Sequence, residues 1–451
     1  MNQTMSDKIL IIPKRIVTVD KDHKILKNTA IEIKGNKIAS FIPIKKIDRS
    51  KYDGNIFDYS DLTIIPGLIQ THVHLCQTLF RGLADDLTLL DWLQQKIFPF
   101  ENAHNKKSLR LSARLGINEL IMGGTTTLLD MGTLNYQEVV FEEMINSGLR
   151  GFSGKCLIDK NDLFPEFKSS TKTEIENMMD LADTFHNSEA GRIKYGFAPR
   201  FVLSCSEGLL KETKTMMTDF PGSLYHTHSS ENKDEINEVR KKHNKENIEY
   251  FNSINVLDDY TVLAHCIHVN DNEKKILKDK NVSIAHCPSA NLKLGSGIAD
   301  IPDFINRGIS VSIGADGAPC NNNLSAFTEM RLAALIQKPL HGPEVLDAQT
   351  IFDIATIGGA KALHLEDEIG SIEIGKKADL VLLDLNKNNN SVSDHDNLVY
   401  SNIVYSSGAD NVSSVMIDGK WVVKESRSLI NDNQKLKSDC EAELKKLFRR
   451  L

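Results

Sequence analysis

Two histidines stand two residues apart at the end of an apolar run, in PGLIQTHVHL at 66–75. If this run is a β-strand, His72 and His74 point to the same side of it, because side chains alternate in direction along a strand. Two imidazoles on one side can bind a metal ion together, or they can be two polar groups at an exposed sheet edge. The rest of the chain has to decide between these interpretations.

Similar residues recur at the ends of other apolar runs. The run that ends in HTHSSE carries His226 and His228, followed by Glu231, and the remaining positions of this kind are Asp130, Arg200, His265, His286 and Asp316. Imidazole nitrogens and carboxylate oxygens suit zinc, iron or manganese, and such a cation lowers the pKa of bound water. Glu231 would then lie just past a strand end, where it could move protons. Alternation places His226 and His228 on one face, so spacing does not choose between them.

The apolar runs that carry these residues alternate with helix-like segments. Each of eight candidate strands is followed by a segment long enough for a helix. The strands lie at 63–74, 124–131, 148–159, 191–200, 222–230, 260–269, 281–290 and 308–317. Eight β–α units predict a closed parallel barrel, in which catalytic residues lie at the carboxyl ends of the strands. Histidines and aspartates gathered at one rim favour a metal site over a polar sheet edge.

Both ends of the chain have a β-like texture. Short runs rich in isoleucine and valine occur at 9–12, 15–20 and 30–42, and again at 378–385 and 412–423, with GN and DG at hairpin turns. We therefore predict an α/β protein with a (β/α)8 barrel and a small β-sandwich domain formed from both chain ends. The predicted parts are the sandwich at 1–63 and 366–428, the barrel at 64–365 and a C-terminal helix at 429–451. A polar run at 386–397 is predicted to be a loop.

The composition excludes several classes of protein. The chain has 451 residues, of which 41% are apolar and 25% charged, as is typical of globular proteins. A net charge of -7 gives no basic surface for nucleic acid or for an anionic membrane. No apolar run reaches membrane-spanning length, the first residues lack the core of a secretion signal, and seven scattered cysteines form no disulfide framework. We expect a cytoplasmic protein that acts on a small molecule.

Four motifs make the chain recognisable. PGLIQTHVHL, HTHSSE, LAHCIHV and IGADGAPCNNN resemble, in this order, the metal-binding signatures of the amidohydrolase superfamily. The resemblance covers nearly the whole chain and is closest to the aminohydrolase branch, which holds adenosine-type deaminases, guanine deaminase and triazine hydrolases. It implies that one divalent metal is held by His72, His74, His228 and Asp316, with Zn²⁺ expected and Fe²⁺ or Mn²⁺ as alternatives. No lysine ends the fourth strand, where binuclear relatives carry one, so we expect a single metal.

The same resemblance implies the chemistry. Glu231 and His265 would transfer protons, and Asp316 would also act as the base that orients the water. The expected reaction is the hydrolytic deamination of an aminated purine with release of ammonia, in a homo-oligomer such as a dimer or tetramer. A non-catalytic sensor is a weaker alternative, because all expected ligands and both proton-transfer residues are present.

The substrate is indicated by fewer residues. Glu101 in FPFEN matches the glutamate that grips the ribose hydroxyls in adenosine-type deaminases, whereas Gln77 and Arg200 resemble a pair that contacts the purine in guanine deaminases. His265 and Trp92 complete the expected substrate contacts. We expect a 5′-modified adenosine, of the 5′-deoxyadenosine, methylthioadenosine or adenosylhomocysteine type, with guanine as the alternative and a triazine after it.

Adenosylhomocysteine is the least favoured of these adenosines. The stretch 170–178 contains no arginine that could match the one that grips the homocysteine carboxylate in relatives.

Overall fold

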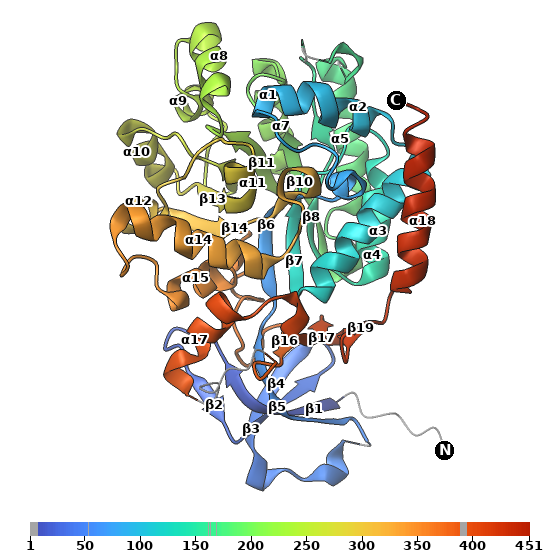
Figure 1. Ribbon diagram of the computed structural model, residues 1–451, viewed down its shortest axis with the longest axis vertical. Helices are drawn as coiled ribbons and strands as arrows, with labels where there is room; N and C mark the ends of the chain where they lie inside the picture. The colour runs from blue at the N-terminus through green and yellow to red at the C-terminus, as the bar shows by residue number, and fades with distance from the viewer. Residues whose placement is uncertain (1–7, 53, 161, 163, 168, 388–394) are drawn as a thin grey trace.

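A computed structural model of the chain describes residues 8–52, 54–160, 162, 164–167, 169–387 and 395–451. It contains two sheets, which form the upper and the lower part of the molecule in Figure 1. Most of the polar loop predicted at 386–397 lies outside the described residues.

The larger sheet is parallel and closes on itself. Its strands are β6 (Leu68–His74), β7 (Thr125–Asp130), β8 (Arg150–Ser153), β9 (Cys156–Leu157), β10 (Ile193–Pro199), β11 (Leu224–Ser229), β12 (Thr261–His265), β13 (Ser283–His286), β14 (Ser310–Ile313) and β15 (Asp316–Gly317). β15 follows β14 after two residues and pairs in parallel with β6, which joins the last strand to the first. Every one of the eight predicted strand positions carries a strand, and the (β/α)8 barrel is confirmed.

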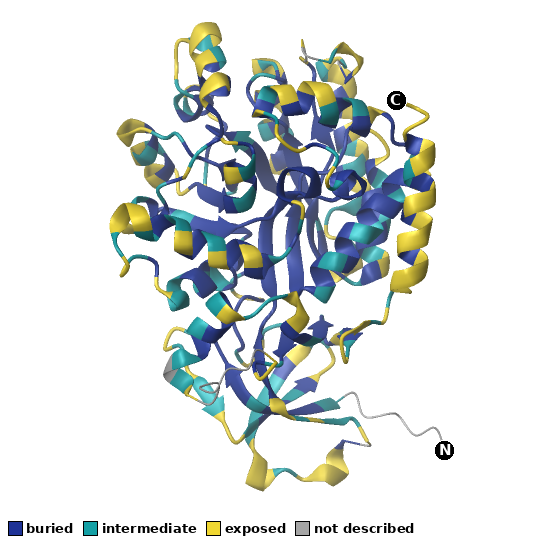
Figure 2. Cartoon of the chain, in the orientation of Figure 1, coloured by how far each residue is buried: buried dark blue, intermediate teal, exposed yellow. Residues whose placement is uncertain are grey.

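Helices surround this barrel on the outside (Figure 1). The longer ones are α3 (Lys106–Met122), α4 (Gln137–Ser147), α5 (Thr171–Phe185), α7 (Glu207–Met216), α8 (Lys233–His243), α10 (Asp271–Asp279) and α14 (Ala326–His341). The strands are buried on both faces, whereas the helices expose their outer faces (Figure 2). None of the helices among the described residues is long and apolar enough to cross a membrane.

The smaller sheet takes strands from both ends of the chain. Its main path runs β19-β18-β17-β16-β5-β1-β3-β4, with β2 paired to β1. The strands are β1 (Lys8–Val17), β2 (Ile25–Lys27), β3 (Thr29–Lys34), β4 (Lys37–Pro43), β5 (Ile56–Pro66), β16 (Leu380–Leu383), β17 (Val412–Ile417), β18 (Lys420–Lys424) and β19 (Arg427–Ser428). Both predicted hairpin turns are present, and at the second Asp418 and Gly419 have φ of 51° and 75°, as a type I′ turn requires.

The chain changes sheets at Gly67, within the single strand predicted at 63–74. That prediction was wrong in one respect: β5 ends at Pro66 in the small sheet, and β6 begins at Leu68 in the barrel. A Cβ atom at Gly67 would lie 1.9 Å from Oγ1 of Thr126, so no larger residue fits. The apolar pattern runs through the break because the residues on both sides of it are buried.

A buried ion pair joins the two sheets beneath the barrel. Arg150, at the start of β8, donates to Asp379 at 2.7 Å and to Asp418 at 3.1 Å. The side chains of Arg150 and Asp379 are only 4% and 2% exposed. Because a buried charge is unfavourable without its partner, this contact fixes the position of the small sheet relative to the barrel.

We predict that Asp379→Ala lowers the free energy of unfolding by up to about 3–5 kcal/mol, because it removes the buried partner of Arg150 and leaves the guanidinium only the more exposed Asp418. Urea denaturation followed by circular dichroism measures the change. Asp22→Ala is the control, since its ion pair with Lys24 is exposed, and it should not change stability measurably. An equally small effect of both variants would contradict the proposed role of the buried pair.

Candidate metal centre and active site

Two ring nitrogens at the barrel rim are oriented by backbone carbonyls. Nδ1 of His74, at the end of β6, lies 3.2 Å from the carbonyl oxygen of Met131, and Nδ1 of His228, on β11, lies 2.7 Å from that of Arg200. A carbonyl only accepts, so the hydrogen of each imidazole stands on Nδ1. The Nε2 lone pairs of both rings therefore point inward, as in metal-binding histidines.

His72 is positioned by another imidazole. Its Nδ1 lies 2.9 Å from Nε2 of His226, and its own Nε2 is buried without a hydrogen-bond partner among the described residues. The two histidines of the fifth barrel strand, β11, therefore have different positions. His228 brings a nitrogen to the cluster, whereas His226 lies behind His72 and orients it.

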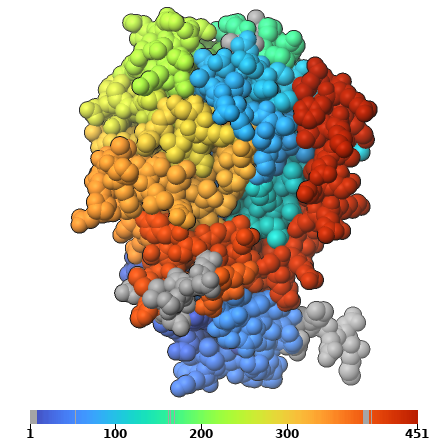
Figure 3. Space-filling model, viewed as in Figure 1, coloured from blue at the N-terminus to red at the C-terminus, as the bar shows by residue number. Residues whose placement is uncertain are grey.

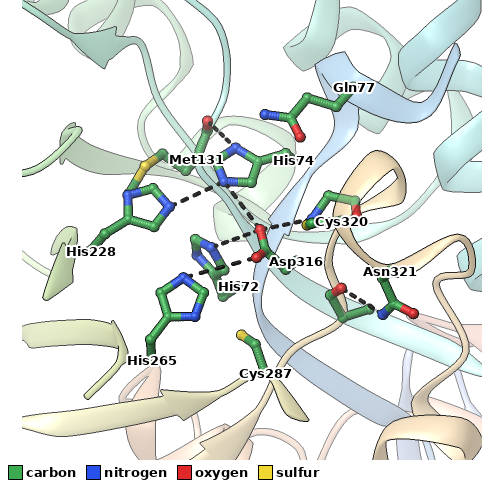
Figure 4. Close-up of polar contacts among 12 residues, drawn as sticks. His72, His74, Gln77, Met131, His228, His265, Cys287, Asp316, Cys320 and Asn321 are labelled. Carbon is green, nitrogen blue, oxygen red and sulfur yellow. Dashed lines mark hydrogen bonds and ion pairs between the residues drawn. The ribbon is translucent and has the colours of Figure 1, made fainter. Parts of the chain in front are cut away.

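The inward-facing atoms converge with a carboxylate (Figure 4). Nε2 of His74 lies 3.3 Å from Nε2 of His228 and 3.4 Å from Oδ1 of Asp316. The same Oδ1 lies 3.3 Å from Nε2 of His72. A zinc ion with bonds of about 2.0–2.1 Å in a tetrahedron separates its ligand atoms by about 3.3–3.4 Å. The four residues therefore fit one divalent ion.

The protonation states of these groups suit a cation. Burial lowers the pKa of His72 and holds the pKa values of His74 and His228 well below their usual range, so the imidazoles are neutral. Burial by itself would raise the pKa of Asp316, but its interactions with the surrounding rings of His72, His265 and His74 outweigh burial and hold this pKa well below its usual range. Neutral imidazoles and an ionised carboxylate are the forms that bind metal.

Two of these residues have unusual backbone conformations. Asp316 has φ of 60° and His265 has φ of 73°, both in the left-handed region that residues with a Cβ rarely adopt. Such strain persists only where the surrounding structure imposes it, and it clusters at functional sites.

A carboxyl group and an imidazole lie beside the cluster. Oε2 of Glu231 is 3.5 Å from Nε2 of His265, which is itself 3.9 Å from Oδ2 of Asp316. Oε1 of Glu231 is buried and has no hydrogen-bond partner in the part of the chain that the structure describes. Burial raises the pKa of Glu231 to about 7, so this carboxyl group can both accept and give a proton near neutral pH.

A cavity opens over these groups. Its apolar wall is formed by Leu89, Trp92, Leu93, Phe201 and Leu294, and its polar residues are His74, Gln77, Arg200, His228, Glu231, Glu235, His265 and Asp316. The indole Nε1 of Trp92 and the amide Oε1 of Gln77 are buried without a hydrogen-bond partner among the described residues. These two atoms are available to a ligand.

Glu101 lies behind this wall in a buried network. Its Oε1 accepts from Nε2 of Gln77 at 2.8 Å, and its Oε2 accepts from Nη1 of Arg200 at 2.9 Å. The guanidinium of Arg200 also lies 5.0 Å from the ring centroid of Phe98. Of the predicted substrate-binding residues, Gln77, Trp92, Arg200 and His265 line the cavity directly, and Glu101 reaches it through two of them.

Two residues of the site were missed by the sequence analysis. Oδ1 of Asn291 lies 2.8 Å from Nδ1 of His265 and so holds the hydrogen there, which leaves Nε2 facing the cluster. Glu235 lines the cavity and accepts from the backbone N–H of Glu231 at 2.9 Å. Its signal in the sequence was the capping box that it forms with Asn232.

Other strand-end residues have structural contacts instead. Asp130 accepts from the backbone N–H of Leu75 at 2.8 Å and thereby braces the turn that follows His74. His268 contacts the carbonyl oxygen of Ser296 at 2.7 Å. His286 is fully buried, and burial lowers its pKa to about 3, so it is a neutral ring of the barrel interior.

Comparison with known proteins gives concordant matches. The Amidohydrolase family matches residues 63–422. The chain is 38% identical to a 5′-deoxyadenosine deaminase from Methanobrevibacter smithii, over 99% of this chain and 98% of the relative. It is 34% identical to a 5-methylthioadenosine/S-adenosylhomocysteine deaminase from Thermoanaerobacter pseudethanolicus, over 98% and 100%. The crystal structure of an adenosine deaminase from Xanthomonas campestris with bound zinc has a TM-score of 0.90 at 27% identity and covers 98% of each chain.

We predict one equivalent of divalent metal per chain, because the four ligand atoms surround a single position. Elemental analysis of the freshly purified protein measures it. Asp316→Ala should lose the metal, since it removes the only charged member of the set. His268→Ala is the matched control and should retain it, because His268 contacts a backbone carbonyl and not the cluster. Two equivalents per chain would contradict the mononuclear site.

Proposed function

The chain belongs to the amidohydrolase family, and we propose that it is a metal-dependent deaminase that releases ammonia from a 5′-modified adenosine. It is a hydrolase of C–N bonds, as its deaminase relatives are. The observation that carries the proposal is the buried pair of Glu231 and His265 beside the cluster of His72, His74, His228 and Asp316. Hydrolytic deamination needs an activated water and a proton donor for the ring, and these groups stand next to each other.

A divalent ion held by His72, His74, His228 and Asp316, proposed to be Zn²⁺ with Fe²⁺ or Mn²⁺ as alternatives, would lower the pKa of a water molecule. Oδ2 of Asp316 accepts a proton from this water as it adds to the purine carbon that bears the amino group. Nε2 of His265 orients the water, because Asn291 fixes the opposite nitrogen as a donor.

Glu231 moves the second proton. In its protonated form it gives this proton to the neighbouring ring nitrogen, and its pKa of about 7 makes this form available near neutral pH. The amino group then leaves as ammonia with the proton that Asp316 took from the water, while the hydroxyl proton of the adduct passes to the Glu231 carboxylate as the carbonyl forms.

The walls of the cavity support a small uncharged 5′ group. Their apolar part suits a purine ring and a methyl or methylthio substituent. Glu101, which lies behind Gln77 and Arg200, has further lone pairs that can accept from ribose hydroxyls. Among the described residues that line the cavity, Arg200 is the one with a permanent positive charge, and it is already paired with Glu101. A homocysteine carboxylate would lack a counter-ion here, so 5′-deoxyadenosine and methylthioadenosine are the proposed substrates.

One observation favours guanine as a second candidate. Arg200 supplies donors and Gln77 an unpartnered amide oxygen on the same side of the cavity. A donor beside an acceptor matches the carbonyl and ring N–H of guanine, which adenine lacks. A triazine is the third candidate.

The domain limits expected from the sequence remain our proposal, with the change of sheet placed at Gly67. An apolar cluster that includes Ile11, Ile33, Ile64, Leu380 and Met416 draws on both chain ends. It supports a small β-sandwich domain beside the barrel. The homo-oligomeric state and the cytoplasmic location are likewise expectations from the sequence.

We predict that Glu231→Gln keeps the metal but lowers kcat by about 10²–10⁴-fold, because an amide cannot transfer the proton. Steady-state kinetics and elemental analysis of the same preparation check it. Glu207→Gln, on the outer end of α7, is the control and should have wild-type kcat. A Glu231→Gln variant with near wild-type kcat would remove this residue from the mechanism.

We predict that 5′-deoxyadenosine or methylthioadenosine has the highest kcat/KM in a screen for ammonia release that includes adenine, adenosylhomocysteine, guanine and hydroxyatrazine. Glu101→Gln should damage nucleosides much more than free bases, because only nucleosides carry the ribose hydroxyls. If guanine leads by tenfold or more, and Arg200→Ala abolishes its turnover, guanine replaces adenosine as the substrate. If hydroxyatrazine leads, both are replaced.

A further inference from the structure

The segment that carries Glu101 is weak as an isolated element. α2 (Phe98–Asn102) is the last part of a continuous helical run at 89–102, whose middle part, η4 (Leu93–Ile97), is π-helical. A helix of about this length is only marginally stable on its own in water, so contacts with other parts of the chain must hold it. The last carbonyl groups of such a helix also lack partners within the helix.

The far end of the chain supplies one of these contacts. α18 (Asn433–Leu447) packs along α3, and the residues after it reach α2, so that the red and blue segments adjoin in Figure 3. Nε of Arg450 donates to the carbonyl oxygen of Ala103, the C-cap residue of α2, at 2.7 Å. Nη2 of Arg450 donates to Oγ of Ser108 at 3.2 Å. A cationic donor at the carboxyl end of a helix is favourable for both hydrogen bonding and charge.

Arg450 is itself held in place. Its Nη1 lies 3.6 Å from Oε1 of Glu443 on α18, a carboxylate whose side chain is only 3% exposed. The ring of Phe448, two residues earlier, meets the ring of Phe100 edge-on at 6.3 Å between centroids. The position of the guanidinium is therefore fixed by α18 and does not depend on a free tail.

Hydrogen bonds continue from Arg450 to the cavity. Oγ of Ser108 lies 3.0 Å from Nδ1 of His104, whose Nε2 lies 2.8 Å from the carbonyl oxygen of Cys76. Cys76 stands directly before Gln77, which donates to Glu101. The helix end next to Glu101 and the residue next to Gln77 are thus both connected to the Arg450 guanidinium through hydrogen bonds.

We propose that Arg450 is a positioning residue for substrate binding, which keeps Glu101 and Gln77 aligned with Arg200 by capping the turn between α2 and α3. The inference rests on the proposed function, because it assigns this corner to the substrate. Neither Glu101 nor Gln77 belongs to the metal cluster, so Arg450 acts on the affinity for substrate and not on the chemical step.

Kinetics of three variants test this role. For 5′-deoxyadenosine, Arg450→Ala should raise KM about three- to tenfold, with kcat within twofold of the wild type and one metal per chain retained. Arg450→Lys should have a KM between those of the wild type and Arg450→Ala. A lysine can reach the Ala103 carbonyl, but it lacks the second nitrogen that also reaches Ser108. Arg449→Ala is the matched control, since Arg449 is an exposed neighbour of the same charge, and it should behave as the wild type. An unchanged KM overturns the proposal, as does a parallel loss of kcat and metal.

Hydrogen exchange tests the same proposal without any substrate. The amides of Ala103 and His104 are hydrogen-bonded to the carbonyls of Pro99 and Glu101. In Arg450→Ala they should exchange at least tenfold faster by mass spectrometry, while amides of β6 keep their wild-type rates. Unchanged exchange at these two amides overturns the positioning role. If instead the wild-type protein deaminates none of the nucleosides, the proposed function fails, and the exchange result still decides whether Arg450 holds the turn.

Discussion

Three imidazole rings and a carboxylate converge at the rim of the barrel, where Nε2 of His74 lies 3.3 Å from Nε2 of His228 and Oδ1 of Asp316 lies 3.3 Å and 3.4 Å from Nε2 of His72 and His74. Because the backbone carbonyls hold the hydrogens of His74 and His228 on Nδ1, their facing nitrogens cannot donate, and the arrangement is repulsive unless a cation lies between them. The protein has to impose it. Two of the rings are held by backbone carbonyls and the third by His226, and these partners belong to the barrel wall. Closure of the barrel between β15 and β6 then brings Asp316 to the histidines of the first strand.

Two buried arginines of the barrel are paired with carboxylates, whereas the buried Glu231 is only partly paired. Arg150 and Arg200, at opposite ends of the barrel, are each buried against a carboxylate. Burial of charges is tolerated when they are paired and hydrogen-bonded. Glu231 departs from this rule, because one of its oxygens is buried without a partner among the described residues, and burial raises its pKa to about 7. A carboxyl group kept partly neutral beside an anionic Asp316 gives the site a proton donor and a proton acceptor a few ångströms apart.

The segment from residue 75 to 105 links the metal cluster to the substrate cavity. Asp130 fixes its start through the N–H of Leu75, and His104 fixes its end through the carbonyl of Cys76. Between these two points it supplies Gln77, Trp92 and Glu101. Its helical run at 89–102 would be marginally stable alone, so the shape of the cavity depends on packing against α3 and α18. The cavity wall can thus vary through this segment without a change at the strand ends that carry the histidine and aspartate cluster.

The sequence by itself determined the local features of this protein. Alternation along a strand predicted that His72 and His74 face the same side, eight apolar runs predicted the barrel, and GN and DG predicted the two hairpin turns. Alternation along the strand left open which fifth-strand histidine reaches the cluster; the motif resemblance indicated His228, and the tertiary structure places His228 there. His226 and His228 share a strand face but differ in depth along the strand by about 7 Å. The contacts of Glu101 with Arg200 and of His265 with Asn291 could not be predicted from the sequence for a related reason. Each joins residues of different β–α units, and only the closed barrel sets the distance between them.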